Sequence, residues 1–499
     1  MSQSPSEEAF PAAVYKDTVL EPLFESAKRH YWRHLMRVNR ASAVMLAQQA
    51  VLTAAEVRAI LGALAEIERL TDVTKLAYTG KHEDLFFVVE AALIDRLGVA
   101  VAGKLHTGRS RNDIDHTVFK LALKERIAGI VEELLGLVAA LLDAAERERA
   151  TLIVAYTHGQ PAQPTTWGHY LGAFIELLLR DFDRVKESAR ASDLSSMGAA
   201  AITTSGFPLD RKLMADLLGF ADVQENSYGC IAAADYATAL YAQLRLVFLH
   251  LGRFVQDLAF RASFEVGHLH VPDAYVQISS IMPQKRNPVP IEHLRLLCSL
   301  AAQRAECVVV ALHNTPFTDI NDAEGEVQAA GYEAFETGAR ALRLLAGLIA
   351  AVRIDEVRVR RHIDESFITM TELADSLVRR ERLSFRQAHD VASRLSRALL
   401  ASGERVSTAS YDRFVEAFAA IAGRAPQLND AGFREALTPE HFIAVRTLPG
   451  GPAPAPLAAS LARYRRDLEA ARSWLGAWSA RLAAGDALLA ARAAAILGR

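Results

Sequence analysis

The chain contains a long proline-free run, from Asp115 to Arg149, in which apolar residues recur at steps of three and four. This spacing places the apolar residues on one face of an α-helix that is longer than an average globular helix. Comparable segments occupy 167–191, 233–266, 289–312 and 327–353. Helices of this length bury their apolar faces against one another in a long antiparallel bundle with polar connections at both ends. The periodicity therefore predicts an all-α fold.

The 499 residues are expected to form three helical domains. Shorter helical runs at 41–70 and 82–97 indicate an N-terminal domain over 1–106, and the long helices form a central bundle domain over 107–363. The helices shorten again in a C-terminal domain over 364–499, in which GGPAPAP precedes an Ala/Arg-rich helical segment at 457–497. Because bundles of this length often bury apolar faces between subunits, we expect an oligomer.

The composition argues against several classes of partner. A formal net charge of −3 without basic blocks gives no electrostatic footprint for nucleic acid or for an anionic membrane. The three cysteines lie far apart and form no CxxC pair, which favours a reducing compartment and argues against disulfides or a zinc site. The first 17 residues lack the basic-then-apolar order of a signal peptide, and the apolar segment 126–143 carries charges. A cytoplasmic protein without a membrane span is predicted.

Four polar islands interrupt the helical pattern, each near the end of a predicted long helix. They are GKLHTGRSRND at 103–113, YTHGQPAQPTTWGH at 156–169, SSIMPQKRNP at 279–288 and NTPFTDINDAEGEVQ at 314–328. In the first island Arg109 and Arg111 carry guanidinium groups that can fork onto carboxylates, and Asn112 adds an amide. This composition is that of a dicarboxylate site, and the alternative is a solvated turn between helices.

The second island offers two histidines. His158 lies beside the hydroxyl of Thr157 and a Gly-Gln turn, which makes it a candidate catalytic residue. A lone histidine in a helical protein is more often a structural group, and we interpret His169 in that way.

The third and fourth islands differ in charge. Prolines prevent a regular helix through 279–288, while paired serines, Lys285 and Asn287 supply a hydroxyl, a cation and an amide. The helix that restarts near Val289 would carry Glu292 in its first turn. The acidic fourth island is either a solvated helix start with an Asn or Asp cap or part of a binding site, and its spacing does not follow an EF-hand loop.

Together these motifs resemble those of the fumarase/aspartase superfamily. SSIMPQKRNP is similar to its signature loop, GKLHTGRSRND resembles the corresponding motif of argininosuccinate lyases, and THGQPAQP is similar to a third shared block. Further similarity lies in EDLFFVVEAAL at 83–93, TELADSLVRR at 371–380, FRQAH at 385–389 and GGPAPAPLA at 450–458. The resemblance implies a three-domain fumarase/aspartase-type fold with a central long-helix bundle. It also implies a homotetramer whose sites are each assembled from three subunits.

The resemblance further implies a lyase that cleaves the C–N bond of an N-substituted aspartate by β-elimination, without a metal or organic cofactor. The products would be fumarate and an amine. Ser279 matches the family's catalytic serine, which takes the Cβ proton, and Lys285 with loop amides would stabilise its alkoxide. His158 and Glu292 match a pair that helps to protonate the departing nitrogen. Nothing in the residues decides which of Ser279 and His158 is the base and which the acid.

The positions that match the family's substrate-binding residues are Ser26, Ser110, Arg111, Asn112, Thr157, Lys285 and Asn287. Three departures accompany these matches. Ile278 stands where the family has a glycine before the serines, and Val289 stands where an aspartate follows Asn-Pro. In the fourth island, Asp319, Glu324 and Val327 replace a tyrosine, a glutamine and a lysine that bind the arginine half of argininosuccinate.

Because an α-carboxylate would meet the acidic side chains of Asp319 and Glu324 there, these two residues are expected to bind a different amine half. The alternatives are an authentic argininosuccinate lyase and a non-catalytic structural or regulatory homologue.

Overall fold

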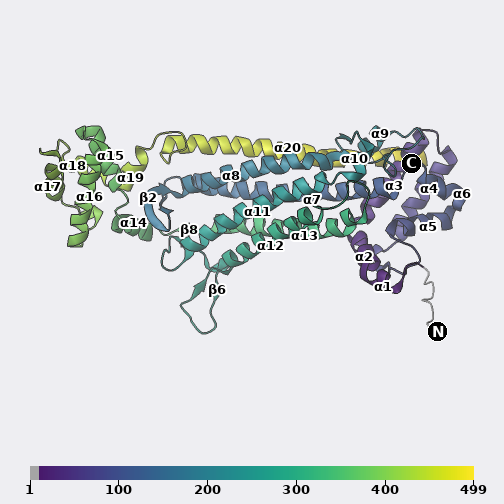
Figure 1. Cartoon of the computed structure of the whole chain (residues 1–499), viewed down its shortest axis with the longest axis horizontal. Coiled ribbons are helices and arrows are strands. Elements are labelled where there is room, and N and C mark those ends of the chain that lie inside the picture. The colour runs from purple at the N-terminus through teal and green to yellow at the C-terminus, as the bar shows by residue number, and fades with distance from the viewer. Residues whose placement is uncertain (1–9, 499) are drawn as a thin grey trace.

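The long helices of the bundle lie side by side along the molecule's longest axis (Figure 1). The computed structural model describes residues 10–498; residues 1–9, which hold much of the stretch read for a signal peptide, lie outside the described residues. The predicted long segments are all helical. They are α7 (Arg111–Arg147), α8 (Trp167–Ser188), α11 (Asp235–Ala262), α12 (Val289–Ala311), α13 (Gly325–Ala351) and α20 (Pro454–Leu497). The predicted all-α bundle is therefore confirmed.

Shorter helices pack at the end of the bundle where α7 begins (Figure 1). They include α2 (Glu21–His30), α3 (Trp32–Gln48), α4 (Ala54–Leu70) and α5 (Leu85–Leu97). The run expected at 41–70 is two helices, because a turn precedes a capping box in which Thr53 and Glu56 satisfy each other's backbone N–H groups. Asp84 caps α5 by accepting from the N–H of Phe87 at 3.0 Å.

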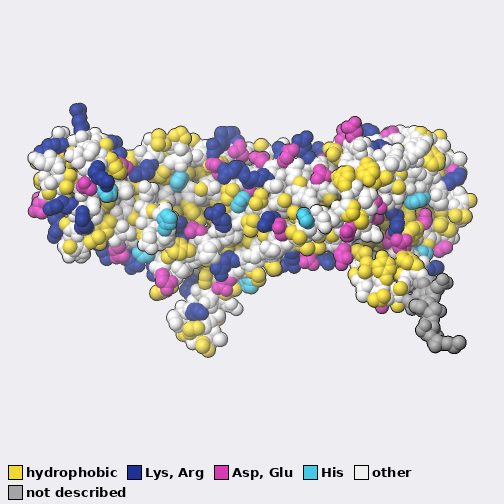
Figure 2. Space-filling model, in the orientation of Figure 1, with side chains coloured by type: hydrophobic (Ala, Val, Ile, Leu, Met, Phe, Trp, Pro, Cys, Tyr) yellow, Lys and Arg dark blue, Asp and Glu magenta, His cyan; other side chains and the backbone are white. Residues whose placement is uncertain are grey.

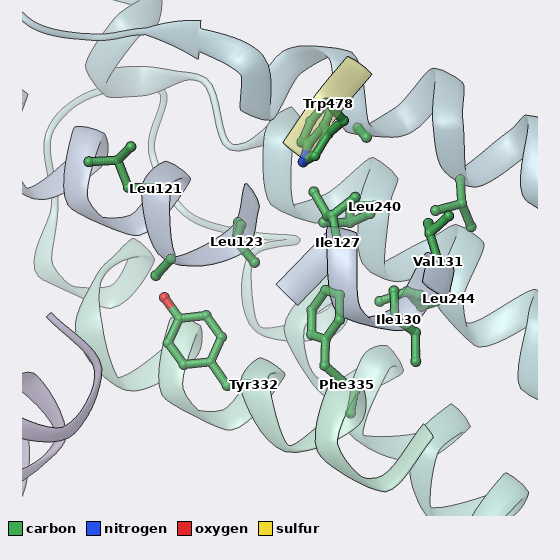
Figure 3. Packing of buried hydrophobic residues seen from close by; sticks show 14 of the residues in the cluster. Leu121, Leu123, Ile127, Ile130, Val131, Leu240, Leu244, Tyr332, Phe335 and Trp478 are labelled. Carbon is green, nitrogen blue, oxygen red and sulfur yellow. The ribbon is translucent and has the colours of Figure 1, made fainter. Parts of the chain in front are cut away.

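The main core is a continuous apolar cluster shared by the long helices. Figure 3 shows Leu123, Ile127 and Ile130 of α7 facing Leu240 and Leu244 of α11, with aromatic side chains of α13 closing one side. Each of these five side chains is buried. The core therefore forms where the three- and four-residue apolar steps of neighbouring helices meet.

Helix α20 returns along the bundle to the end where the chain begins (Figure 1). Trp478 of α20 is buried, and its Nε1 donates to the backbone oxygen of Lys124 at 3.0 Å. The helices α15 (Met370–Glu381), α16 (Phe385–Ser402), α17 (Tyr411–Ala422) and α18 (Asp430–Ala436) instead bury a separate apolar cluster. The division at 1–106, 107–363 and 364–499 stays a prediction.

The strands of the described residues are short and form two-stranded pairs. In the longest pair, β1 (Leu152–Thr157) and β2 (Gln160–Thr166) are antiparallel, with Thr157 opposite Gln160. Strands β6 (Gln277–Ile278) and β7 (Arg286–Asn287) form the base of a second hairpin, which projects from the side of the bundle (Figures 1 and 2). Two of the four polar islands are therefore hairpins.

Within residues 10–498, none of the helices combines the length and the apolar character that a bilayer span requires.

Candidate active site

The first group of predicted site residues lies where α7 begins. Ser110 is its N-cap, and the Ser110 hydroxyl is 3.1 Å from the Asn112 side-chain oxygen. The buried carboxylate of Asp113 accepts the N–H groups of Ser110 at 2.9 Å, Gly198 at 2.9 Å and Ala200 at 3.0 Å. Burial raises the pKa of Asp113 to about 6, although these three hydrogen bonds oppose the shift. Asp113 therefore holds Ser110 and the helix start against the 198–200 loop.

Arg111 is paired within the chain. Its Nη1 lies 3.0 Å from Glu83 Oε1 and 2.8 Å from Asp84 Oδ2, and its guanidinium lies over the ring of Phe87. Burial opposes the charge, but the two carboxylates outweigh it and hold the pKa of Arg111 above its ordinary value. These contacts fix a permanent cation at the start of α7, beside Asn112.

Arg109, the other cation of this island, points away from the site. Its Nη1 donates to Ser42 Oγ at 3.2 Å, and its guanidinium lies over the ring of Phe86 among the N-terminal helices. Burial lowers the pKa of Arg109 to about 10. Arg109 therefore joins α3 to the α7 entry and is not free for a substrate carboxylate.

The acidic fourth island folds back onto the same place. Oxygen atoms of Asp319 and Glu324 and a ring nitrogen of buried His116 all lie within 4.8 Å of one another. Burial, followed by the charge of Asp319, raises the pKa of Glu324 to about 7. Burial also raises the pKa of Asp319, while Arg111 and a hydrogen bond from Asn112 oppose that shift. Two carboxyl groups predicted to bind substrate thus lie beside Arg111 and Asn112.

Ser26 lies on α2, which packs near the start of α13. It lines a cavity of about 730 Å³ together with Glu25, Arg29, Glu326 and Tyr332. The Ser26 hydroxyl oxygen is buried and has no hydrogen-bond partner within the described chain. An unpaired buried hydroxyl is costly, so it is available to a ligand group.

The second group of predicted residues is at the tip of the β1–β2 hairpin. His158 and Gly159 form its two-residue turn with φ of 54° and 73°, the positive values that primed hairpin turns require. Thr157 and His158 are exposed. The hairpin base is fixed by His169, whose ring is 2.8 Å from Thr165 Oγ1 and 2.9 Å from the Gly450 oxygen. The structural role predicted for His169 agrees with these contacts.

The third group is in the hairpin that carries Ser279. The Ser279 hydroxyl oxygen accepts the N–H groups of Met282 at 3.1 Å and Ile281 at 3.4 Å. Asn287 pairs with Gln277 at the hairpin base, and Lys285 is exposed on the returning arm. The loop therefore points two backbone donors at the one hydroxyl that the sequence singled out.

The base of this hairpin is anchored by Arg286. Its side chain forms an ion pair with Asp273 and donates to the backbone oxygen of Val271 at 2.9 Å. Ile278, which stands where the family has a glycine, lies in β6 opposite Arg286 of β7 and does not have a positive φ. An isoleucine fits this extended backbone without strain. Its side chain is 83% exposed, and the apolar tip of the hairpin is visible in Figure 2.

The three groups lie far apart within one chain. Helix α7 has 37 residues and separates Arg111 from the His158 hairpin, a span of about 55 Å at about 1.5 Å per residue. Helix α12 has 23 residues and separates Ser279 and Glu292 from Asp319 by about 35 Å. Within residues 10–498 no hydrogen bond or ion pair joins His158 to Glu292, and both are exposed.

Sequence reasoning gave no role to three residues of the first group. Asp84 contacts Arg111, His116 contacts the acidic island, and Asp113 fixes the helix start. Asp84 and Asp113 occupy cap positions, which sequence can identify through a carboxylate followed by an apolar helical run. No sequence pattern marks His116, because its neighbours come from other helices and surround it only when the bundle packs.

Comparisons with known proteins show the family of this chain. A model of the Lyase family matches residues 21–302, and a model of the argininosuccinate lyase C-terminal region matches residues 367–444. Argininosuccinate lyase 2 of Agrobacterium fabrum is 54% identical over 461 residues, which are 92% of this chain and 92% of that protein. The chain belongs to the argininosuccinate lyase family. It is a carbon–nitrogen lyase of the fumarase/aspartase superfamily.

Further relatives match at lower identity over most of their length. Argininosuccinate lyase of Thioalkalivibrio sulfidiphilus is 34% identical over 93% of this chain and 95% of that protein. Among solved structures, EDDS lyase in complex with formate has a TM-score of 0.83 at 27% identity and covers 98% of this chain and 96% of that one. A variant of EDDS lyase with bound fumarate has the same TM-score at 28% identity, over 96% of both chains.

Proposed function

We propose that this protein splits an N-substituted aspartate into fumarate and an amine by β-elimination, without a resident metal or organic cofactor. The base removes a proton from Cβ, the electron pair forms the Cα–Cβ double bond, and the Cα–N bond breaks toward nitrogen. A proton delivered to that nitrogen completes the amine. This proposal rests on family membership and on the hydroxyl held by the Ser279 loop.

The carrying observation is the pair of backbone donors on Ser279 Oγ, from Met282 at 3.1 Å and Ile281 at 3.4 Å. A serine hydroxyl is a weak base, and N–H groups aimed at its oxygen lower the cost of an alkoxide. We therefore assign Ser279 as the base, with Lys285 adding positive charge when the loop closes. His158, supported by Glu292, delivers the proton to nitrogen directly or through a water.

The succinyl carboxylates of the substrate carry two negative charges, which grow as the Cβ proton leaves. Arg111 and Asn112 supply a fixed cation and an amide, and Ser110 and Ser26 add hydroxyls. Thr157 and Asn287 contribute from the two hairpins. Electrostatic stabilisation of the carboxylate next to Cβ, which approaches a double negative charge as the proton leaves, is therefore the largest task of the site.

We further propose a homotetramer in which each site takes one group of residues from each of three chains. The supporting observation is the separation of about 35 to 55 Å between the groups, as estimated from helix length. Proton transfer requires hydrogen-bonding distances, which no single chain offers between Arg111 and either hairpin. The free cysteines Cys230, Cys298 and Cys307 support a cytoplasmic location.

The experiment is a fumarate-release assay on purified enzyme with argininosuccinate, aspartate and several N-substituted aspartates. Release from at least one N-substituted aspartate that is not argininosuccinate supports the proposal. Release only from argininosuccinate would make the protein an authentic argininosuccinate lyase, a candidate that the 54% identity to argininosuccinate lyase 2 favours. Silence with every substrate, in both directions, would leave only a non-catalytic homologue.

A further inference from the structure

Two carboxyl groups of the acidic island lie close to the ring of the buried His116. A ring nitrogen of His116 and one carboxylate oxygen from each of Asp319 and Glu324 lie within 4.8 Å of one another. Among the described residues no hydrogen bond joins the histidine to either carboxylate; its Nδ1 is 3.4 Å from the Tyr236 hydroxyl instead. The carboxyl groups of Asp319 and Glu324 and the neutral ring of His116 therefore lie close together without a hydrogen bond between the ring and either carboxyl group.

A further buried acceptor lies on the same side of α13. Gln328 follows Glu324 by one helical turn and shares its helix face. Its Nε2 donates to the Tyr236 hydroxyl at 3.0 Å, while its Oε1 is buried without a hydrogen-bond partner in the described chain. The hydrogen bonds of Gln328, Tyr236 and His116 thus hold the His116 ring in place beside the two carboxyl groups, and they leave the Gln328 side-chain oxygen as an unpaired acceptor.

Building on the proposed function, we infer that Asp319 and Glu324 recognise an amine half that carries a distal ammonium and no carboxylate. An ammonium donates three hydrogen bonds and carries the charge that two converging carboxylates require. A distal carboxylate would meet like charge in a partly buried site, which discriminates against argininosuccinate-like amino acids. His116 and Tyr236 act as positioning residues behind the two carboxyl groups.

The geometry favours an ammonium over a divalent metal ion. Arg111 is close enough to act on the carboxyls of both Asp319 and Glu324. Its guanidinium would repel a doubly charged ion twice as strongly as a singly charged one.

The preference for a cation should depend on pH, because the Glu324 carboxyl has a pKa of about 7. Above that pH the group is a carboxylate, and below it the group is neutral, so affinity for an ammonium rises as pH rises through 7. Primary amines keep their charge over this range because their pKa lies near about 10. The other charged or titratable groups that act on this cluster are Asp84, Arg111, Asp113, Asp115, His116, Lys120, Tyr236 and Asp319.

The test is amination of fumarate with three amines of matched chain length. 1,4-Diaminobutane ends in an ammonium, butylamine in a methyl group and 4-aminobutyrate in a carboxylate. We expect wild-type kcat/KM to be highest for the diamine, and at least about tenfold above 4-aminobutyrate. The diamine-to-butylamine ratio should rise between about pH 6 and about pH 8.

The double variant Asp319→Asn/Glu324→Gln should lose at least about tenfold of the ratio of diamine to butylamine kcat/KM. A wild-type circular dichroism spectrum and melting temperature show that the variant is folded. The matched control is Asp322→Asn, a neutralised exposed acid in the same segment, which should keep the preference. In Glu324→Gln the rise of the ratio with pH should flatten.

Several outcomes overturn the inference. One is a double variant that keeps the diamine preference. A second is a wild-type enzyme that prefers 4-aminobutyrate, or that acts only on argininosuccinate. A third is a preference that EDTA abolishes and added Mg²⁺ or Zn²⁺ restores, because the three side chains would then be metal ligands. Absence of fumarate chemistry with every amine and every substituted aspartate would instead contradict the proposed function.

Discussion

At the scale of single residues, the site depends on groups that hold backbone N–H donors or are held by them. The Ser279 hydroxyl oxygen accepts two loop N–H groups, and the Asp113 carboxylate accepts three from the α7 start and the 198–200 loop. In the proposed mechanism the first arrangement stabilises the oxygen that acts as base, and the second fixes the helix start that carries Arg111. Each arrangement depends on the oxygen atoms of a single side chain, which accept the backbone N–H groups.

Replacing Ser279 with alanine should lower kcat by at least about a hundredfold while KM changes little, because the group acts in the transition state. The neighbouring Ser280→Ala is the matched control and should stay near wild type. Steady-state kinetics of fumarate release measure both. Near-normal turnover of Ser279→Ala would transfer the role to Ser280.

Removing the Asp113 carboxylate should damage binding more than the reaction step. Asp113→Ala leaves three buried N–H groups without acceptors, at a cost of about 1–3 kcal/mol for each such group in general. The Ser110–Asn112 start of α7 should loosen, raising KM for the substituted aspartate and lowering the melting temperature. Calorimetry and kinetics together check this. A variant with unchanged KM would show that the 198–200 loop contributes nothing to binding.

At the scale of elements, aromatic side chains of α11 pack closely against glycines of α13. A Cβ built on Gly338 would lie 2.0 Å from the ring of Phe248, and one on Gly331 would lie 2.3 Å from the Tyr241 hydroxyl. Any side chain at these positions must displace the aromatic ring that packs on the glycine. Because α13 begins at the acidic island, the register of this contact also sets where Glu324 stands.

Gly338→Ala should therefore destabilise the protein by about 1–3 kcal/mol, since the core must expand to admit a methyl group. Gly136→Ala on α7 is the control, because a Cβ there meets nothing within 4 Å. That second change should stabilise the helix by about 0.5–1 kcal/mol. Thermal unfolding of both variants measures the difference, and a Gly338→Ala protein as stable as wild type would refute the close approach.

At the scale of the whole molecule, the length of the bundle separates the predicted site groups. Arg111 and His158 lie about 55 Å apart along α7. The β6–β7 hairpin, which carries Ser279, projects from the side of the bundle (Figure 1). The proposed shared site would therefore take its residues from more than one copy of the chain. In that proposal each of the two hairpins completes a site of a neighbouring chain.

Co-expression of Arg111→Met and His158→Asn chains should restore part of the activity that each lacks alone. In a mixed oligomer some sites receive a wild-type Arg111 from one chain and a wild-type His158 from another. The control pairs Arg111→Met with Asn112→Ala, which belong to the same group, and it should restore nothing. Fumarate release by the purified mixtures decides, and equal activity of both mixtures would contradict shared sites.

The sequence by itself determined the long helices, the four polar islands and the family. Helical periodicity is a local property, so α7, α11 and α13 follow from three- and four-residue apolar steps. The motif around Ser279 predicts a reacting loop for the same reason, since its residues lie within ten consecutive positions.

Only the tertiary structure determined which side chains lie near one another. Arg109 and Arg111 are two residues apart, yet one joins the N-terminal helices and the other lies beside Asp84 and the acidic island. His116 met Asp319 and Glu324 only through the packing of α7 against the segment that leads into α13. Such contacts depend on crossing and register of helices distant in sequence, which local spacing does not encode.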